Sequence, residues 1–391
     1  MSERKKILLG ILTVFVIFSV LVTGTVAGLV ISNYDHIGRL IKVVGLIKTD
    51  YIETVTPTQL IDGAMKGVVD SLGDKYSVYL DPKDNKHLSE VIEGRFGGVG
   101  IILSLKDEKR LVILKPIKNS PADRAGIKAG DVVVKIDDTE TSTITQEKAI
   151  SMMRGKEGTK VILTVYRESE KKMLSFPVIR EAISVPTVEG EMLPGYADIA
   201  YISMSQFSTD TGQELGKELG ELVRKNPKGI ILDLRYNHGG ELNAAVKAAS
   251  YFVPKGPVVY IVDKYGNSEE KKTVGNYLGI PLVVLVNEES ASASEIVAGA
   301  IRDYKTGTLV GTKTFGKGVV QTIYQLDGGS GVKLTTAKYL TPNKTDINQK
   351  GIEPDIKVEL GKGQMVVQPP EDVKQFDDQL KKAIEVLRNK F

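Results

Sequence analysis

The chain has 391 residues, enough for two or three domains that each bury their own core. It is 41% hydrophobic and 26% charged, as expected of a folded protein, and its net charge of +3 gives no reason to expect a nucleic-acid partner. The absence of cysteine excludes disulfides, thiolate metal sites and a cysteine nucleophile.

The first 32 residues have the pattern of an export segment. Arg4, Lys5 and Lys6 precede an uncharged, mostly apolar run over residues 7–32, and about 20 apolar residues span a bilayer as a helix. Basic residues ahead of the run favour a cytoplasmic N-terminus. A cleaved signal peptide is the alternative, with a weak cleavage site at residues 25–27. We favour a single-pass anchor in the cell membrane, and either alternative places the remaining chain outside the cytoplasm.

Residues 33–93 show helical spacing and form a predicted helical arm. The apolar positions fall into two series, and Gly73 and Asp74 end the second of them. The series are Ile37, Leu40, Ile41, Val44 and Ile47, then Leu60, Ala64, Val68 and Leu72. The arm is predicted either to form a homodimer or to act as a spacer packed on the next domain.

Residues 94–182 change to short β-runs and form a predicted β-domain. The pattern predicts one helix over residues 145–153 and four strands. The strands are expected at residues 101–103, 111–117, 132–136 and 160–166.

This β-domain resembles a PDZ domain of the bacterial protease type. The resemblance rests on a glycine-rich turn before the first strand, on the stretch SPADRAGIKAGD at residues 120–131, and on RGKEG at residues 154–158. It implies that an extended peptide adds as a strand and that backbone N–H groups receive its terminal carboxylate. The alternative is a small β-domain without a ligand. By the resemblance, the carboxylate-binding loop is formed by Phe96, Gly97, Gly98, Val99, Gly100 and Ile101.

Strands and helices alternate over residues 183–360, which predicts an α/β layered domain with helices covering a sheet. The main predicted strands are residues 199–204, 229–234, 258–262 and 281–286, and the predicted helices are residues 212–223, 241–249 and 293–304. A charged amphipathic helix over residues 372–388 is expected to pack as a cap within the C-terminal segment 361–391.

Three alternate serines occupy the junction of a predicted strand and a helix, in the sequence SASASE at residues 290–295. A helix N-terminus favours a developing oxyanion beside a serine nucleophile such as Ser292. The spacing of Ser292 and Glu295 also fits a capping box, which is a commoner structure than an active site.

A lysine flanked by glycines follows, in GTKTFGKGVVQ at residues 311–321. Two features exclude a P-loop: Gly318 stands where magnesium needs Ser or Thr, and a strand rather than a helix follows. Burial would favour the neutral amine of Lys317, which could then serve as a general base. Gln321 falls on the same strand face and could orient it. The alternative is a solvated surface lysine.

Two further glycines, Gly239 and Gly240, follow a predicted strand in DLRYNHGG at residues 233–240. Their N–H groups, with that of Ala293, could form an oxyanion hole. The alternative is an ordinary turn with a structural Asp233–Arg235 pair.

The order of these motifs, ending with GIEPD at residues 351–355, resembles the carboxyl-terminal processing proteases of peptidase family S41. The resemblance implies a ClpP/crotonase-like α/β core, Ser292 as nucleophile, Lys317 as base and Gln321 as its support. It assigns the oxyanion hole to Gly239 or Gly240 with Ala293. It also implies that neither a metal nor another cofactor is needed. Supporting roles are implied for Glu295, Asp303 and Thr314.

The leading hypothesis is therefore a serine endopeptidase that binds the C-termini of exported proteins or peptides through its PDZ domain. One alternative is a Ser/His/Asp peptidase that uses His238. The other is a non-catalytic PDZ adaptor or chaperone built on a peptidase fold.

Overall fold

The computed structural model describes residues 13, 15–20, 23–24, 34–104, 110–361, 363–364, 366, 369 and 373–391. The chain divides into two units, Met1–Tyr79 and Leu80–Phe391, and each is described by itself. Most of the predicted anchor lies outside the described residues. Within the described part, no helix combines the length and the apolar character that a membrane crossing needs. The anchor therefore stays a prediction.

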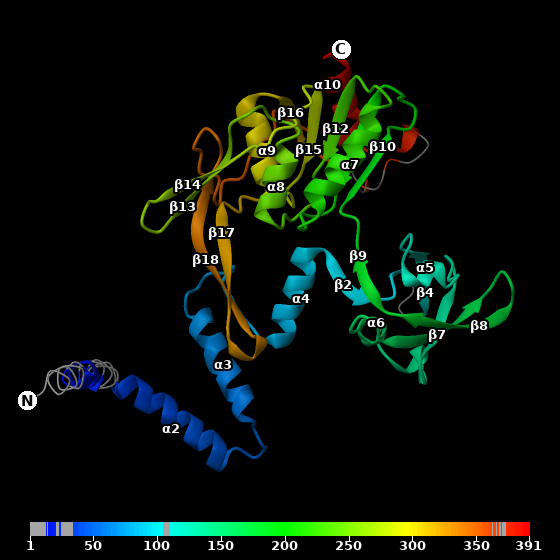
Figure 1. Cartoon of the computed structure of the whole chain (residues 1–391). Helices are drawn as coiled ribbons and strands as arrows, with labels where there is room; N and C mark the ends of the chain where they lie inside the picture. The colour runs from blue at the N-terminus through cyan, green and yellow to red at the C-terminus, as the bar shows by residue number, and fades with distance from the viewer. Residues whose placement is uncertain are drawn as a thin grey trace, which may run out of the picture. The chain divides into compact units, whose positions relative to one another are not determined.

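The first unit contains the two predicted helices of the arm, α2 (Tyr34–Asp50) and α3 (Pro57–Asp70) (Figure 1). A capping box begins α3: the Gln59 N–H donates to Thr56 Oγ1 at 3.3 Å, and the Thr56 N–H donates to Gln59 Oε1 at 2.9 Å. Strand β1 (Val78–Leu80) lies at the junction of the two units. Dimerisation of the arm stays a prediction.

The second unit begins with helix α4 (Pro82–Glu93). Asp81 caps its N-terminus, and Gly94 ends it in the left-handed conformation at φ 68°. Strand β2 (Arg95–Gly98) then pairs antiparallel with β9 (Glu181–Ser184). The chain thus enters and leaves the β-domain through one two-stranded ribbon.

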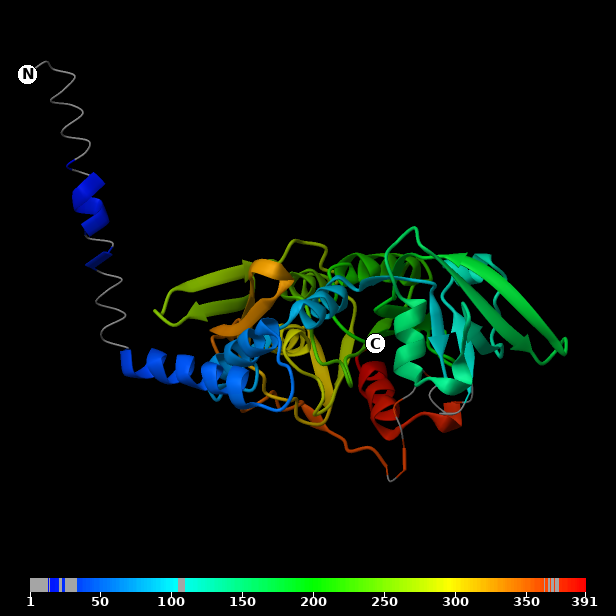
Figure 2. The same cartoon turned by 90° about the horizontal axis from the view of Figure 1, so that it is seen from below.

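The β-domain, coloured cyan to green in Figure 2, contains a sheet with the order β3-β4-β5-β7-β8. The predicted strands and helix are present, and Asp131 and Arg167 form a buried ion pair at 2.7 Å beneath them. Strand β8 was not predicted, because its turn has no glycine and Lys171 adopts φ 51° instead. The elements are β3 (Ile101–Leu103), β4 (Leu111–Pro116), α5 (Pro121–Arg124), β5 (Val132–Ile136), β6 (Thr139–Glu140), α6 (Gln146–Met153), β7 (Lys160–Arg167) and β8 (Lys172–Ile179).

The predicted α/β layered fold is confirmed in the remaining chain. Its main sheet has the order β10-β11-β12-β15-β16-β19, with β10 antiparallel to β11 and all other neighbours parallel. The strands are β10 (Val188–Met192), β11 (Ile199–Met204), β12 (Gly229–Asp233), β15 (Leu282–Val286), β16 (Gly307–Gly311) and β19 (Ile356–Lys357).

Alternate side chains of these parallel strands enter two different cores, because the side chains of a strand point to opposite faces. Ile202, Leu232 and Val284 pack beneath three helices on one face. These are α7 (Thr211–Val223), α8 (Leu242–Ala249) and α9 (Ala293–Tyr304). Ile231 and Val283 face the C-terminal helix α10.

Helix α10 spans Asp378–Arg388, so the predicted start at residue 372 was too early. The helix begins where Asp377 Oδ1 accepts the Leu380 N–H at 2.8 Å, after a short 3-10 turn at Val373–Gln375. Its buried Leu380, Ile384 and Leu387 share one hydrophobic core with Ile231 and Val283 of the sheet. The helix is therefore a structural layer of the α/β domain.

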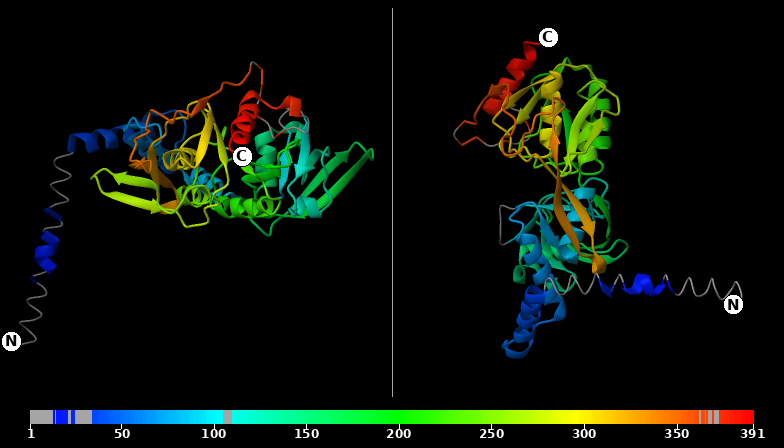
Figure 3. Two further views of the ribbon diagram at one scale, coloured as in Figure 1. Left: turned by 90° about the horizontal axis from the view of Figure 1, so that it is seen from above. Right: turned by 90° about the vertical axis from the view of Figure 1, so that its left-hand side faces the viewer.

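A second sheet carries the long hairpin of β17 (Val319–Gln325) and β18 (Gly331–Leu340) (Figure 3). Strand β18 also pairs antiparallel with β13 (Pro257–Asp263), which pairs with β14 (Ser268–Lys272). This sheet brings β17, and the lysine loop before it, beside the N-terminus of α9.

Candidate active site

The three alternate serines have different environments. Ser290 and Ser294 are fully buried, and their hydroxyl groups donate to the carbonyl oxygens of Leu234 and Asn237, each at 2.8 Å. Ser292 is half-buried, and its side chain lines a cavity of about 620 Å³. Of the three, only Ser292 is therefore placed to meet a substrate.

Ser292 also has an unusual backbone, with φ 54° and ψ −111°. A serine in this sparsely populated region costs about 1–3 kcal/mol, so the surrounding contacts must hold it there. Two of those contacts are to its own peptide groups. The Ser292 N–H donates to Glu295 Oε2 at 3.0 Å, and its carbonyl accepts the Ile296 N–H at 3.0 Å.

The cavity that Ser292 lines also brings together most of the predicted catalytic residues. Lys317 precedes β17, and Val319, Val320, Gln321 and Ile323 of the strand line the same cavity. The predicted strict alternation is not observed, because the register of β17 shifts between Val320 and Gln321. The Gln321 amide donates at 3.4 Å to Val319 O and to Thr335 Oγ1. The cavity wall further includes Gly239, Gly240, Ala293 and Tyr339.

Glu295 links the serine segment (residues 290–295) to the lysine loop (residues 312–318), which precedes β17. Its carboxylate is fully buried, and besides the Ser292 N–H it accepts the Lys317 N–H at 2.9 Å and the Gly316 N–H at 2.8 Å. The Thr314 hydroxyl donates to Glu295 Oε1 at 2.6 Å. The capping interaction expected from Ser-x-x-Glu thus exists, and the same carboxylate also fixes the lysine loop.

The third implied supporting residue, Asp303, lies elsewhere. It is near the C-terminal end of α9, where its Oδ2 accepts the Asn343 N–H at 2.8 Å. Its side chain lines a different cavity from that of Ser292. Asp303 is placed to support the loop after β18, and the structure does not bring it to the cavity of Ser292.

The glycine loop packs directly on the serine segment. A Cβ on Gly239 would lie 2.6 Å from Ala291 O, and a Cβ on Gly240 would lie 2.0 Å from Phe207 O, so only glycine fits. The Gly239 N–H donates to Asn237 Oδ1 at 2.9 Å. On either side of Gly240 the loop is hydrogen-bonded to Phe207: Gly239 O accepts the Phe207 N–H, and the Glu241 N–H donates to Phe207 O. The Gly239 N–H already has an acceptor, so the Gly240 N–H is the better candidate to form the predicted oxyanion hole with the Ala293 N–H.

Asn237, at the centre of this loop, was not predicted to matter. Its buried side-chain amide donates to Met204 O at 2.8 Å, and its backbone carbonyl oxygen accepts from the Ala291 N–H and the Ser294 hydroxyl. Asn237 therefore sets the spacing between the glycine loop and the serine segment. Nothing in the local sequence distinguishes it from any other loop asparagine.

The root of the glycine loop is a buried charge network around Arg235. Its guanidinium donates to Asp233 at 2.6 Å, to Asp377 at 2.9 Å and to Gln379 at 3.0 Å. The structural Asp233–Arg235 pair that the sequence analysis left open is thus present. Burial, together with the Asp233 charge, raises the pKa of the Tyr201 phenol, which donates to Asp233 at 2.7 Å.

His238 lies at the rim of the cavity, with its side chain 73% exposed. Its Nδ1 is 3.3 Å from Glu289 Oε2. Asp233 is buried against Arg235, so the aspartate of a Ser/His/Asp triad would have to come from elsewhere. Within the described ranges, no group of three or more acidic or histidine side chains could hold a metal ion.

The PDZ-like domain has a groove of about 250 Å³ between β3 and α6. Phe96, Val99, Gly100 and Ile101 line it, whereas Gly97 and Gly98 belong to the β2 ribbon and do not. A Cβ on Gly97 would lie 2.2 Å from Gly155 O, so that glycine serves the packing of the ribbon. Four of the six residues expected to form the carboxylate-binding loop thus border this groove, and their binding of a carboxylate stays a prediction.

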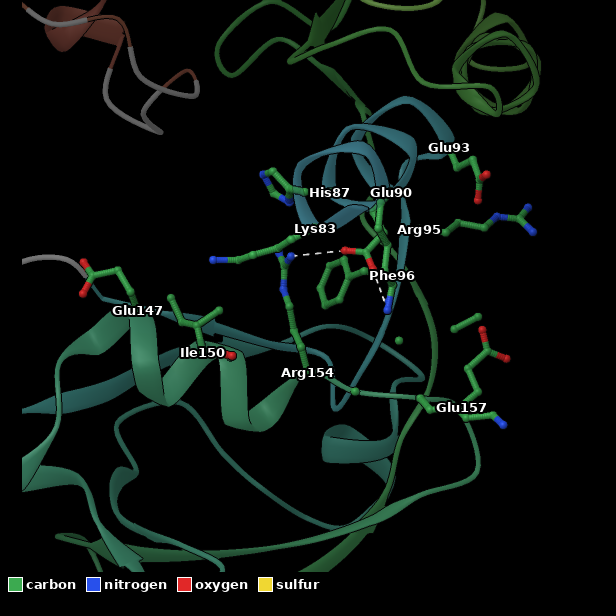
Figure 4. A pocket seen from close by; sticks show the side chains of 16 residues that line it. Lys83, His87, Glu90, Glu93, Arg95, Phe96, Glu147, Ile150, Arg154 and Glu157 are labelled. Atoms are coloured by element: carbon green, nitrogen blue, oxygen red, sulfur yellow. Dashed lines mark hydrogen bonds and ion pairs between the residues drawn. The ribbon is translucent and has the colours of Figure 1, made fainter. Parts of the chain in front are cut away.

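A larger, charged cavity of about 980 Å³ adjoins this groove, between α4 and α6 (Figure 4). The Arg154 guanidinium lies 4.2 Å from the centre of the Phe96 ring and 3.5 Å from Glu90 Oε2. Phe96 and Arg154 line both the groove and this cavity. Glu90 of helix α4 thus contacts Arg154, which lines the groove, and Leu88, Val91 and Ile92 of the same helix line the cavity of Ser292.

Replacing Glu295 with glutamine is expected to lower the predicted peptidase activity about 100-fold. In the wild type, the Glu295 carboxylate accepts three backbone N–H groups, and the amide nitrogen of glutamine cannot accept them. Each lost hydrogen bond to a charged group costs about 1.5–3 kcal/mol. The measurement is kcat on a fluorogenic peptide. Glu288→Gln is the matched control, because Glu288 also accepts a threonine hydroxyl, from Thr312 at 2.7 Å, but accepts neither the Ser292 N–H nor the Lys317 N–H, which both bond Glu295. Equal activities of the two variants would contradict this role for Glu295.

Comparison with known proteins agrees with this geometry. The family model for peptidase family S41 matches residues 198–358, that for a PDZ domain matches residues 112–167, and that for the N-terminal domain of the activating protease CtpB matches residues 22–84. The carboxy-terminal processing protease CtpA of Bacillus subtilis is 39% identical over 331 residues, which are 84% of this chain and 70% of that protein. The chain belongs to peptidase family S41.

Membership of family S41 makes the chain a serine peptidase of the carboxy-terminal processing type, with a PDZ domain. CtpB of Bacillus subtilis is 35% identical over 82% of this chain and 67% of the relative. The solved structure of the photosystem II D1 C-terminal processing protease is 29% identical, with a TM-score of 0.50, and the match covers 86% of this chain and 89% of that one. The non-catalytic adaptor is therefore disfavoured.

Proposed function

We propose that this S41 peptidase is an endopeptidase in which Ser292 is the nucleophile and Lys317 the general base. The observation that carries the proposal is the Glu295 carboxylate, which bonds the backbone N–H groups of both residues and so fixes their segments together. Both side chains line one cavity, and apolar Val319, Val320 and Ile323 beside Lys317 favour a neutral amine.

In the proposed reaction, the neutral Lys317 amine takes the Ser292 hydroxyl proton while Oγ attacks the substrate carbonyl carbon. The N–H groups of Ala293 and Gly240 receive the charge that develops on the carbonyl oxygen. Lys317 then protonates the leaving amine, which leaves an ester on Ser292. Water, deprotonated by the same lysine, hydrolyses that ester and restores the enzyme.

The groove between β3 and α6 supports recognition of substrate C-termini. Ile101, Leu103, Ile150 and Met153 give it an apolar lining that suits an apolar terminal side chain, and the turn at Val99 and Gly100 lies at its end. The substrate chain would then continue past α4 toward Ser292. The apolar run at residues 7–32 extends the proposal to exported substrates at the outer face of the membrane, and protease accessibility of the chain on intact cells tests this topology.

The test compares two peptides with the same apolar C-terminal sequence, one ending in a free carboxylate and one in an amide. We expect cleavage upstream of the terminus, about tenfold slower for the amide, because the amide loses charged hydrogen bonds to the groove. The Ser292→Ala variant serves as the blank. Equal rates for the two peptides would contradict terminal recognition. Failure of the full chain to cut either peptide would contradict the proposed peptidase.

A further inference from the structure

Tyr339 contacts the serine segment but belongs to none of the motifs found in the sequence. It lies on β18 and is 1% exposed, and its side chain lines the cavity of Ser292. Its hydroxyl donates to Ser292 O at 3.2 Å and is 3.5 Å from Glu295 Oε2. Its backbone N–H donates to Gly318 O at 3.1 Å, next to Lys317.

The carbonyl that Tyr339 bonds belongs to the peptide group that also carries the Ala293 N–H. A peptide group is planar, and none of the peptide bonds in the described chain is cis, so the carbonyl and the N–H point in opposite directions. A bond that fixes Ser292 O therefore also fixes the direction of the Ala293 N–H. This matters at Ser292 because its backbone conformation is unfavourable for a side-chain-bearing residue.

We propose that Tyr339 is a positioning residue that holds the Ser292–Ala293 peptide plane, so that the Ala293 N–H points at the developing oxyanion. This inference rests on the proposed Ser292 mechanism. The Tyr339 hydroxyl acts through that peptide and transfers no proton. The oxyanion forms during the reaction and is absent from the bound substrate. Loss of the Tyr339 hydroxyl should therefore affect catalysis more than substrate binding.

The test is Tyr339→Phe in the full chain, which removes the hydroxyl and keeps the ring. We expect kcat to fall about tenfold with KM within about twofold, the magnitude of one lost hydrogen bond. A peptide aldehyde, which forms a tetrahedral hemiacetal with Ser292 Oγ, should bind about tenfold more weakly. Substrate affinity should be unchanged when Tyr339→Phe is added to the inactive Ser292→Ala variant.

Tyr304→Phe is the matched control. Tyr304 is the last residue of α9, at the far end of that helix from Ser292, and its partly buried hydroxyl donates to the carbonyl oxygen of Pro257 at 3.1 Å. This control should keep kcat and aldehyde affinity while losing the same kind of bond. Wild-type kcat and aldehyde affinity in Tyr339→Phe would overturn the inference, as would an equal loss of substrate affinity. Residual cleavage by Ser292→Ala would refute the proposed function itself, which is a separate outcome.

Discussion

Replacing either Ser292 or Lys317 with alanine is expected to abolish peptide cleavage while the chain stays folded. Loss of a general base costs about 10²–10⁴-fold, and loss of a nucleophile costs more. Neither side chain is part of a hydrophobic core, so the thermal midpoint should change by only a few degrees. The measurement is single-turnover cleavage of a fluorogenic peptide, with circular dichroism as the check on folding.

Two further variants separate the dyad from its alternatives. Lys313→Ala is the matched control, because Lys313 lies on the same loop but its side chain is 51% exposed and pairs with Glu353 at 3.2 Å. It should keep full activity. His238→Ala should also keep its chemistry, since this exposed histidine lies at the rim. Full activity in purified Lys317→Ala would refute the dyad, and an inactive His238→Ala would favour the triad.

Replacing Arg235 with methionine is expected to destabilise the second unit by about 3–5 kcal/mol. The substitution leaves Asp233 and Asp377 as buried carboxylates without their cation, which is the costly way to break a buried ion pair. Burial alone would lower the pKa of Arg235, but the two carboxylates raise it above its usual value, so this cation persists at any working pH. The measurement is the free energy of unfolding in urea.

Arg95→Met provides the comparison for this second prediction. Arg95 pairs with Asp210, but its side chain is 55% exposed, and such pairs contribute about 0–1 kcal/mol. A similarly small loss for Arg235→Met would mean that water replaces the missing guanidinium and that the network is not a root of the glycine loop.

Much of the catalytic fold could be predicted because its elements are strongly patterned. Strand Leu282–Val286 is buried at every position, and α9 starts at the predicted residue, Ala293, after a capping signal. Strand Ser268–Lys272 could not be predicted, because its residues are polar or charged and mostly exposed. The C-terminal helix was expected too early, since only the side chain of Asp377 decides where it begins.

The site was less predictable than the fold. The pairing of Ser292 with Lys317 in one cavity depends on how β17 packs beside α9, which no local pattern encodes. The spacing of Ser292 and Glu295 predicted a capping box, and the box is present. Because the capping box alone explains a glutamate at this position, nothing in the sequence indicated its bonds to the lysine loop. Tyr339 and Asn237 act through several hydrogen bonds to residues that are distant in the sequence. Asp303, assigned through the resemblance, lies at the opposite end of its helix from Ser292.

The Arg235 network also bears on when the enzyme can become active. Arg235 and Asp377 are 142 positions apart in the chain, so the ribosome makes the glycine loop long before the carboxylate that anchors it. Until residues 377–379 have been synthesised and α10 has packed, Arg235 lacks two of its acceptors and the loop bearing Gly240 has no fixed root. The glycine loop therefore takes its anchor from residues that are synthesised after every other residue of the candidate site.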